Sequence, residues 1–236
     1  RAMRPVNLHL PMKRPEDVIP HLGKGARHWK EGYSAQALAT HWWRHNALPP
    51  DVARVLDTAE PFRGAELVDA FFERETALGD AAQGSQTDLM AVLGLAGGGL
   101  AVMGVEAKVN ETFGKLIGEE LAPGCSARKR ERIARLCRIL GLDPDDRAQV
   151  AGLRYQLLHR TCAVLFEAQR YHARLGVTLV ETFSAEDAHW GEFVTFVRAL
   201  GGAAEKGRLC EVGVPGGVRL WLGWCNSAAA QAVARA

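Results

Sequence analysis

Hydrophobic positions follow helical spacing in the first third of the chain. Ser34 is a suitable N-cap for the helix-forming stretch SAQALATHWWRH, and Asp51 can cap a second helix, VARVLDTA. Residues 64–78 then predict a third helix, because their apolar side chains fall on one stripe. The members of that stripe are Leu67, Val68, Phe71 and Phe72. We therefore predict a helical region over residues 33–78, preceded by an irregular arm over residues 1–32.

The rest of the chain shows shorter apolar runs that are typical of strands. TDLMAVLGLA and LAVMGVEAKV flank a glycine triplet and predict a buried β-hairpin. The amphipathic stretch RKRERIARLCRIL predicts a helix, and a longer helix follows over residues 147–175. VTLVETFS then predicts a strand, AEDAHWGEFVTFVRALG a helix capped by Ser184, and RLCEVGV with VRLWLGWC a second hairpin.

This order of elements predicts an α/β or α+β fold in which helices flank a central mixed β-sheet. We expect one domain over residues 1–236, with its core at residues 85–226. A chain of 236 residues with 47% hydrophobic content is long enough to bury such a core.

Charge and cysteine content narrow the range of function classes. The formal net charge of +2 excludes a histone-like nucleic-acid binder but permits a local basic face. The five cysteines are scattered without a C-x-x-C motif, which indicates reduced thiols. No stretch approaches the roughly 18 apolar residues of a membrane span, so we expect no membrane association and a cytoplasmic location.

Candidate chemistry is concentrated on the second strand of the first predicted hairpin. Gly104, Glu106 and Lys108 share one face of this strand because side chains alternate. Asp88 begins the preceding strand, and it lies on the same face if the glycine loop has an odd number of residues. An even loop would place Asp88 on the opposite face unless a bulge intervenes.

Two carboxylates beside a lysine suit the hydrolysis of a phosphodiester. The acids can hold Mg²⁺ through hard oxygen ligands, and the lysine can position or polarise the attacking water. The alternative is structural: Glu106 and Lys108 would form a solvent-facing ion pair, and Asp88 would cap a turn.

The order Asp88, glycine hairpin, E-x-K, helix and strand resembles the PD-(D/E)XK nuclease superfamily, which has the restriction-endonuclease-like fold. Within it, the phrases SQTDLM, VEAKVNETFG, LRYQLLHRT and LGW resemble an uncharacterised bacterial family. The resemblance implies that Asp88 and Glu106 bind Mg²⁺ or Mn²⁺ and that the Ala107 carbonyl completes the metal site. It also implies that Lys108 assists the attacking water. Thr87 replaces the superfamily's proline, a departure that removes no ligand.

The resemblance also implies accessory residues from two helices. An additional glutamate from the helix before the first core strand would be Glu73, although helix geometry also allows Glu75. The helix after the E-x-K motif offers Gln156, Arg154 and Arg160, which the sequence does not rank. We select Gln156 as the catalytic candidate and Arg154 as a nucleic-acid contact.

Arginines crowd the helix RKRERIARLCRIL, and three of them share one face at helical spacing: Arg128, Arg132 and Arg135. This face is a candidate track for a phosphate backbone, or else an ordinary solvated face. Together these features predict a Mg²⁺-dependent DNA endonuclease, related to restriction or defence. The alternative is a non-catalytic nucleic-acid-binding or interaction module that retains the fold, and the sequence leaves a homodimer open.

His41 and His45 lie one helical turn apart, a spacing that can bind zinc. No H-E-x-x-H glutamate or obvious third ligand accompanies them. We therefore interpret both as helix-surface histidines beside core tryptophans.

Overall fold

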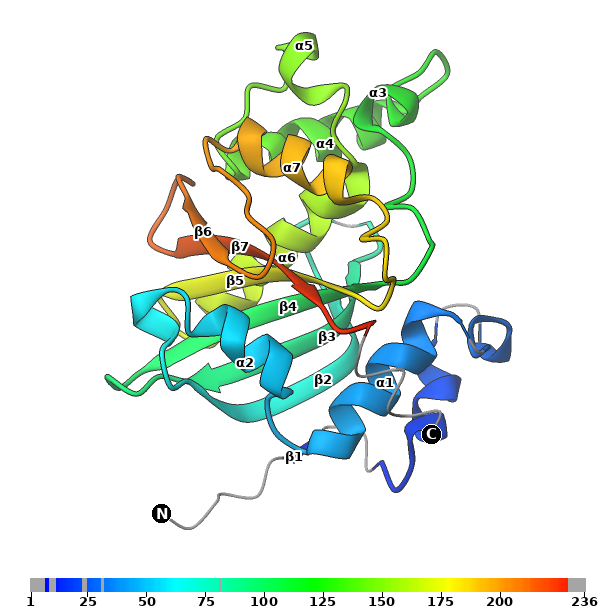
Figure 1. The fold of residues 1–236 in the computed structure, drawn as a ribbon. Helices are drawn as coiled ribbons and strands as arrows, with labels where there is room; N and C mark the ends of the chain where they lie inside the picture. The colour runs from blue at the N-terminus through cyan, green and yellow to red at the C-terminus, as the bar shows by residue number, and fades with distance from the viewer. Residues whose placement is uncertain (1–6, 9–11, 23–24, 31, 81, 229–236) are drawn as a thin grey trace.

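The computed structural model describes residues 7–8, 12–22, 25–30, 32–80 and 82–228. The described chain forms a seven-stranded mixed sheet with the strand order β1-β2-β3-β4-β5-β7-β6 (Figure 1). The strands are β1 (Asn7–Leu8), β2 (Glu66–Thr76), β3 (Ser85–Gly94), β4 (Leu100–Lys108), β5 (Leu175–Thr182), β6 (Leu209–Val212) and β7 (Arg219–Asn226).

Strand directions divide the sheet into an antiparallel and a parallel part. β2, β3 and β4 form an antiparallel meander, whereas β4, β5 and β7 run parallel. β1 pairs in parallel with β2, and β6 pairs in antiparallel fashion with β7 at the opposite edge. The sheet is therefore mixed, as the sequence predicts.

Helices cover both faces of the sheet, as Figure 1 shows. α1 and α2 pack on one face, and α4, α6 and α7 pack on the other. The α-helices are α1 (Ser34–His45), α2 (Pro50–Leu56), α3 (Ile117–Glu120), α4 (Ala127–Ile139), α5 (Arg147–Val150), α6 (Tyr155–Arg170) and α7 (Trp190–Ala199). Short 3-10 helices occupy Pro15–His21, Gly25–His28 and Glu60–Phe62.

Two hydrophobic clusters result from side-chain alternation along the central strands. On β4, Val102 points into the cluster under α4, α6 and α7, while Ala101 and Met103 point into the cluster under α1 and α2. Both faces of the sheet are thus buried, which explains the nearly continuous apolar runs of the central strands.

The predicted helix over residues 64–78 is wrong, because this segment forms strand β2. A register shift between Leu67 and Asp69 inserts Val68 as an extra residue opposite β3. This irregularity interrupts the two-residue alternation of a strand. The remaining apolar positions then imitate a helical stripe, and only pairing with β3 reveals the strand.

The predicted helix over residues 147–175 is correct only in part, because the segment is divided into α5 and α6, and β5 begins at Leu175. At the break, the backbone bonds to another segment: Ile117 N–H donates to the Leu153 carbonyl, and Gly118 N–H to that of Ala151. Nonlocal hydrogen bonds thus replace the helical ones.

Helix α7 begins at Trp190, later than the Ser184 cap predicts. Asp187 and His189 adopt left-handed backbone conformations, with φ of 48° and 70°. The Asp187 carboxylate accepts hydrogen bonds from Trp224 Nε1 and Asn226 Nδ2, at 2.9 and 2.7 Å. These bonds hold the preceding loop outside the helix.

Within the described residues, no helix is both long and apolar enough to cross a membrane.

Candidate active site

Three carboxylates lie side by side on three adjacent strands. Residues 95–99 connect β3 to β4, and their odd number follows from the pairing of Gly94 with Leu100. Extending this register past the Leu89–Val105 pair puts Asp88 opposite Glu106. The geometric condition set by the sequence is therefore met, and both acids line one cavity together with Lys108.

Glu73 supplies the third carboxylate, from strand β2 and not from the helix that was expected. Its neighbours in β2 pair with Leu89 and Thr87, so Glu73 falls opposite Asp88. Glu73 has a φ of 51°, a left-handed conformation that is uncommon for a residue other than glycine. The strained residue aims its side chain into the same cavity as Asp88 and Glu106.

Two cations hold the Glu106 carboxylate. Lys108 Nζ donates to Oε1 at 2.7 Å, and Arg160 Nε donates to Oε2 at 2.6 Å. Lys108 Nζ also donates to Gln156 Oε1 at 3.2 Å. Glu106 and Lys108 are buried, with 2% and 4% relative exposure, so they are not the solvent-facing pair of the structural alternative.

Helix α6 packs against the face of β4 that carries Glu106 and Lys108, and it presents polar side chains to them. Gln156 and Arg160, one turn apart, contact Lys108 and Glu106 respectively. Farther along, an added Cβ on Gly104 would lie 2.6 Å from Val164 Cγ2. Glycine at this position therefore permits the close approach of α6 that brings Arg160 to the carboxylates.

The three carboxyl groups differ in acidity. Burial and the Asp88 charge raise the pKa of Glu73 to about 8. Burial and the Glu106 charge likewise raise the pKa of Asp88 to about 7. Burial also acts to raise the pKa of Glu106, but the charges of Lys108 and Arg160 outweigh it and lower this pKa to about 2. At neutral pH the site therefore contains an ionised Glu106, a largely protonated Glu73 and an Asp88 that is close to the midpoint of its titration.

Ala107 lies between Glu106 and Lys108 and joins the carboxylates through its backbone. Its N–H donates to Asp88 Oδ2 at 2.8 Å. In an extended strand, the N–H and C=O of one residue point to the same edge, so the Ala107 carbonyl also faces β3. Its methyl group packs into the core on the opposite side of the sheet. The backbone of Ala107 thus adds an oxygen on the side of the site where Asp88 lies.

The cavity has a volume of about 700 Å³. Its floor carries the carboxylates, and its walls come from the turn after β4, the start of α6 and the start of α1. The wall residues include Tyr33, Ser34, Glu111, Thr112, Phe113, Lys115, Tyr155 and His159.

The structure separates the remaining sequence candidates. Glu75 accepts a hydrogen bond from Gly84 N–H at 3.0 Å, so its carboxylate is engaged in a turn away from Glu106. Arg154 donates to Glu192 at 2.6 Å, and it is not among the described residues that line the cavity. The sequence does not rank Arg160, although its four-residue spacing from Gln156 places the two side chains on one face of a helix.

A second hollow of about 350 Å³ adjoins the cavity, and Gln83, Tyr155 and His159 line both. Helix α4 contributes its positive charges to this hollow: Arg128, Lys129 and Arg132. The predicted basic face is therefore present in part.

The third predicted residue of that face, Arg135, is not among the described residues that line this hollow. It donates to Asp80 at 3.0 Å, and Arg132 also donates to Asp80, at 2.7 Å. Arg132 and Arg135 are thus both engaged in ion pairs with Asp80, and Lys129 forms an ion pair with Glu120.

The donor set of the cavity fits a hard divalent cation. Carboxylate and carbonyl oxygens are the ligands that Mg²⁺ prefers. Asp88 and Glu106 offer carboxylate oxygens to the cavity, whereas Ala107 is not among the described residues that line it. Burial and the crowding of Asp88, Glu106 and Glu73 raise two of their pKa values, and a cation would relieve the repulsion between the carboxylates.

The histidine pair differs from the prediction of two surface side chains. His45 is exposed, but His41 is buried, with 7% relative exposure. Its ring approaches two carboxylates from other elements. The two carboxylates belong to Asp51 and Glu181, and the sequence could not show their approach because Glu181 lies 140 positions from His41.

Comparison with known proteins identifies the family of the chain. The model of a family described as a domain of unknown function, DUF6946, matches residues 11–229. The chain belongs to this family, because the match covers nearly its whole length. No curated protein and no solved structure shows significant similarity to the chain.

Proposed function

We propose that this member of the DUF6946 family is a divalent-metal-dependent endonuclease that hydrolyses phosphodiester bonds of DNA. The proposal is carried by the convergence of Asp88, Glu106 and Lys108 in one cavity. The antiparallel meander, the α6 crossover and the parallel strand β5 are consistent with the resemblance to PD-(D/E)XK nucleases. Restriction or defence, in the cytoplasm, is the biological role that this resemblance favours.

In this proposal, Asp88, Glu106 and the Ala107 carbonyl hold Mg²⁺ or Mn²⁺. The bound ion supplies charge neutralisation at the phosphate and a more acidic water. Arg160 keeps the Glu106 carboxylate ionised and oriented through its 2.6 Å hydrogen bond.

Lys108 is the group that acts on the attacking water. Its ammonium is held between Glu106 Oε1 and Gln156 Oε1, so the third N–H remains for a water or a phosphate oxygen. Glu73 holds a proton near neutral pH, which reduces the negative charge that an incoming phosphodiester meets. Gln156 is a positioning residue in this arrangement, because it acts through Lys108.

DNA is favoured as the substrate class by the surroundings of the cavity. The hollow lined by Arg128, Lys129 and Arg132 adjoins the cavity and shares wall residues with it. A phosphate backbone lying across this hollow would meet positive charge before it reaches the carboxylates.

The second candidate is a nucleic-acid-binding module without catalysis. It is favoured by the internal neutralisation of Glu106, because both of its oxygens already accept hydrogen bonds from cations. An ion must compete with these bonds, and a site that has lost metal binding would keep them.

Nicking of supercoiled plasmid separates the two candidates. We expect the wild type to nick DNA with Mg²⁺ or Mn²⁺ and to stop when a chelator is added. The double variant Asp88→Asn, Glu106→Gln should bind DNA with unchanged salt dependence but show no nicking. Metal-independent binding without cleavage by the wild type, over varied DNA and RNA, would establish the binding module instead.

A further inference from the structure

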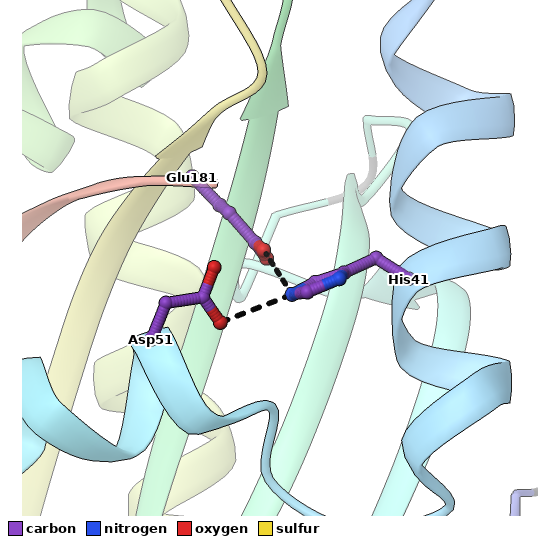
Figure 2. Close-up of side chains that lie close together, drawn as sticks. All are labelled: His41, Asp51 and Glu181. Carbon is purple, nitrogen blue, oxygen red and sulfur yellow. Dashed lines mark hydrogen bonds and ion pairs between the residues drawn. The ribbon is translucent and has the colours of Figure 1, made fainter. Parts of the chain in front are cut away.

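A second cluster of ligand-type side chains lies on the opposite face of the sheet. Glu181 of β5 pairs in register with Ala107, whose side chain points away from the cavity. His41 of α1 and Asp51 of α2 meet Glu181 there (Figure 2). Within the part of the chain that the structure describes, these three form the group of histidine, cysteine and acidic residues whose ligand atoms lie within 4.8 Å of one another.

We infer that His41, Asp51 and Glu181 form a zinc site that joins the two helices to the sheet. The proposal is independent of the nuclease activity, and it uses none of the residues of the cavity.

The distances between the side chains suit a tetrahedral ion. His41 Nε2 lies 3.1 Å from Asp51 Oδ1 and 3.4 Å from Glu181 Oε1. Two ligands bound to zinc at about 2.0–2.1 Å with tetrahedral angles are about 3.3 Å apart. Figure 2 shows the Nε2 edge of the ring turned toward both carboxylates, as coordination requires. Small movements of these side chains would therefore admit the ion.

Supporting hydrogen bonds fix the ligands in these positions. Glu181 Oε2 accepts from Trp42 Nε1 at 2.9 Å, and Oε1 accepts from Ser227 Oγ at 2.8 Å. Asp51 Oδ1 accepts from Val52 N–H at 3.1 Å. Partners of this kind orient ligands in established metal sites. The Asp51 side chain keeps 12% exposure, which leaves a path for a water as the fourth ligand.

Charge balance also favours a divalent ion. Glu181 is completely buried and Asp51 is largely buried, so their two negative charges lie in a medium of low polarity. One imidazolium neutralises one of these charges, whereas Zn²⁺ with a neutral imidazole neutralises both. The imidazole nitrogen selects a transition metal over Mg²⁺, which prefers oxygen ligands.

Zinc content and zinc affinity test the proposal on the full chain. After chelator treatment and titration with Zn²⁺, we expect one high-affinity zinc per chain and a higher melting temperature. His41→Gln and Asp51→Asn should each lower the affinity by more than the roughly 10- to 100-fold that loss of a supporting residue costs. Co²⁺ in place of zinc should give visible absorption bands of tetrahedral type, and His41→Gln should lose them.

Two control variants make the result specific. His45→Gln removes the exposed histidine one turn away, and it should bind zinc like the wild type. Glu106→Gln should also keep its zinc while losing any response to Mg²⁺, which separates this site from the cavity. The proposal would be overturned if the wild type bound no zinc tightly. It would also be overturned if His45→Gln lowered the zinc affinity as much as His41→Gln does. The cluster would then be a buried ion-paired triad alone.

Discussion

The carboxyl groups in the cavity differ in pKa because their neighbouring charges differ. Glu106 lies between two cations and loses its proton readily, while Asp88, directly opposite, retains one to a pKa of about 7. Pairs of acids whose pKa values are driven apart are common at functional sites. The contrast assigns Glu106 as the permanent anion of the site and Asp88 as the group that ionises when a metal arrives.

Substitution of Glu106 and Lys108 should separate metal binding from turnover. Glu106→Gln should lower plasmid nicking by at least about a thousandfold and abolish the rise in melting temperature with Mg²⁺. Lys108→Ala leaves both acids in place, so it should retain that rise while nicking falls by about 100-fold or more. Equal loss of the metal response in both variants would contradict a role for Lys108 at the water.

The pH dependence of stability follows from the direction of each pKa shift. In the metal-free protein, folded Asp88 holds a proton between its ordinary pKa of 3.8 and about 7, whereas the unfolded chain has lost it. Its contribution to the free energy of unfolding therefore falls as pH rises from about 4 to about 7. Glu106 behaves oppositely: its contribution is present above about 4.5 and is lost as pH falls toward about 2.

Chemical denaturation across this range checks the Asp88 effect. We expect Asp88→Asn to flatten the decline of stability between pH about 4 and about 7 relative to the wild type. With saturating Mg²⁺ the wild-type decline should reverse, because the metal binds the ionised carboxylate. If, without metal, the free energy of unfolding changed with pH equally in the wild type and in Asp88→Asn, the pKa of Asp88 would not be raised in the folded protein.

Glu73 and Glu75 provide a matched pair on one strand. Glu73→Gln alters the cavity, so nicking should fall and its pH optimum should shift. Glu75→Gln changes only the turn bond to Gly84, so it should nick DNA like the wild type, with a stability change of about 1 kcal/mol. The same loss of nicking in both variants would remove Glu73 from the site.

At the scale of elements, the site depends on the match between β4 and α6. Glu106 and Lys108 on the strand meet Arg160 and Gln156 on the helix, and Gly104 sets the approach of the two elements. The meander alone brings the carboxylates together. The crossover helix then adds the positive charge that gives them different acidities.

Gly104→Ala should disturb this match. The added methyl group would lie 2.6 Å from Val164 Cγ2, so α6 must move outward at a cost of about 1–3 kcal/mol. We expect nicking to fall together with stability, since Arg160 moves with the helix. Combining Gly104→Ala with Val164→Ala removes the clash and should recover most of the nicking, measured per folded molecule. Failure of this second change to restore nicking would show that α6 does not set the site.

At the scale of the whole molecule, a near-neutral protein must concentrate its positive charge to bind DNA. The net charge is only +2, yet α4 places three basic side chains around the hollow beside the cavity. Binding through such a patch releases counterions in proportion to the phosphates contacted. The salt dependence of binding therefore reports on this surface directly.

Replacing Arg128 and Lys129 with alanine should make the salt dependence shallower. If each contacts one phosphate, the slope of log K against log salt should decrease in magnitude by about 2. Arg198→Ala with Arg208→Ala removes the same charge from exposed positions elsewhere, and it should leave the slope unchanged. Fluorescence anisotropy over a salt series measures the slope for each double variant. Equal slopes in the two variants would exclude the hollow as a binding surface for the DNA backbone.

The sequence by itself determined the features that rest on neighbouring residues. Alternation along β4 placed Glu106 and Lys108 on one face, whereas the face of Asp88 depended on the length of the glycine loop, which only the pairing of Gly94 with Leu100 decided. These conclusions hold because strand geometry is local and has a period of two residues. Where a bulge interrupts that period, as at Val68, the same reasoning wrongly predicted a helix.

Only the tertiary structure decided which distant groups share a site. Glu73 reaches Asp88 through pairing of β2 with β3, and Arg160 reaches Glu106 through packing of α6 on β4. His41 meets Glu181 across 140 positions of the chain, by the packing of α1 on one face of the sheet. No local pattern encodes such contacts, because burial, strand register and helix approach are set by the whole core. Those same contacts decide the charge and acidity of each side chain, and hence the chemistry it can perform.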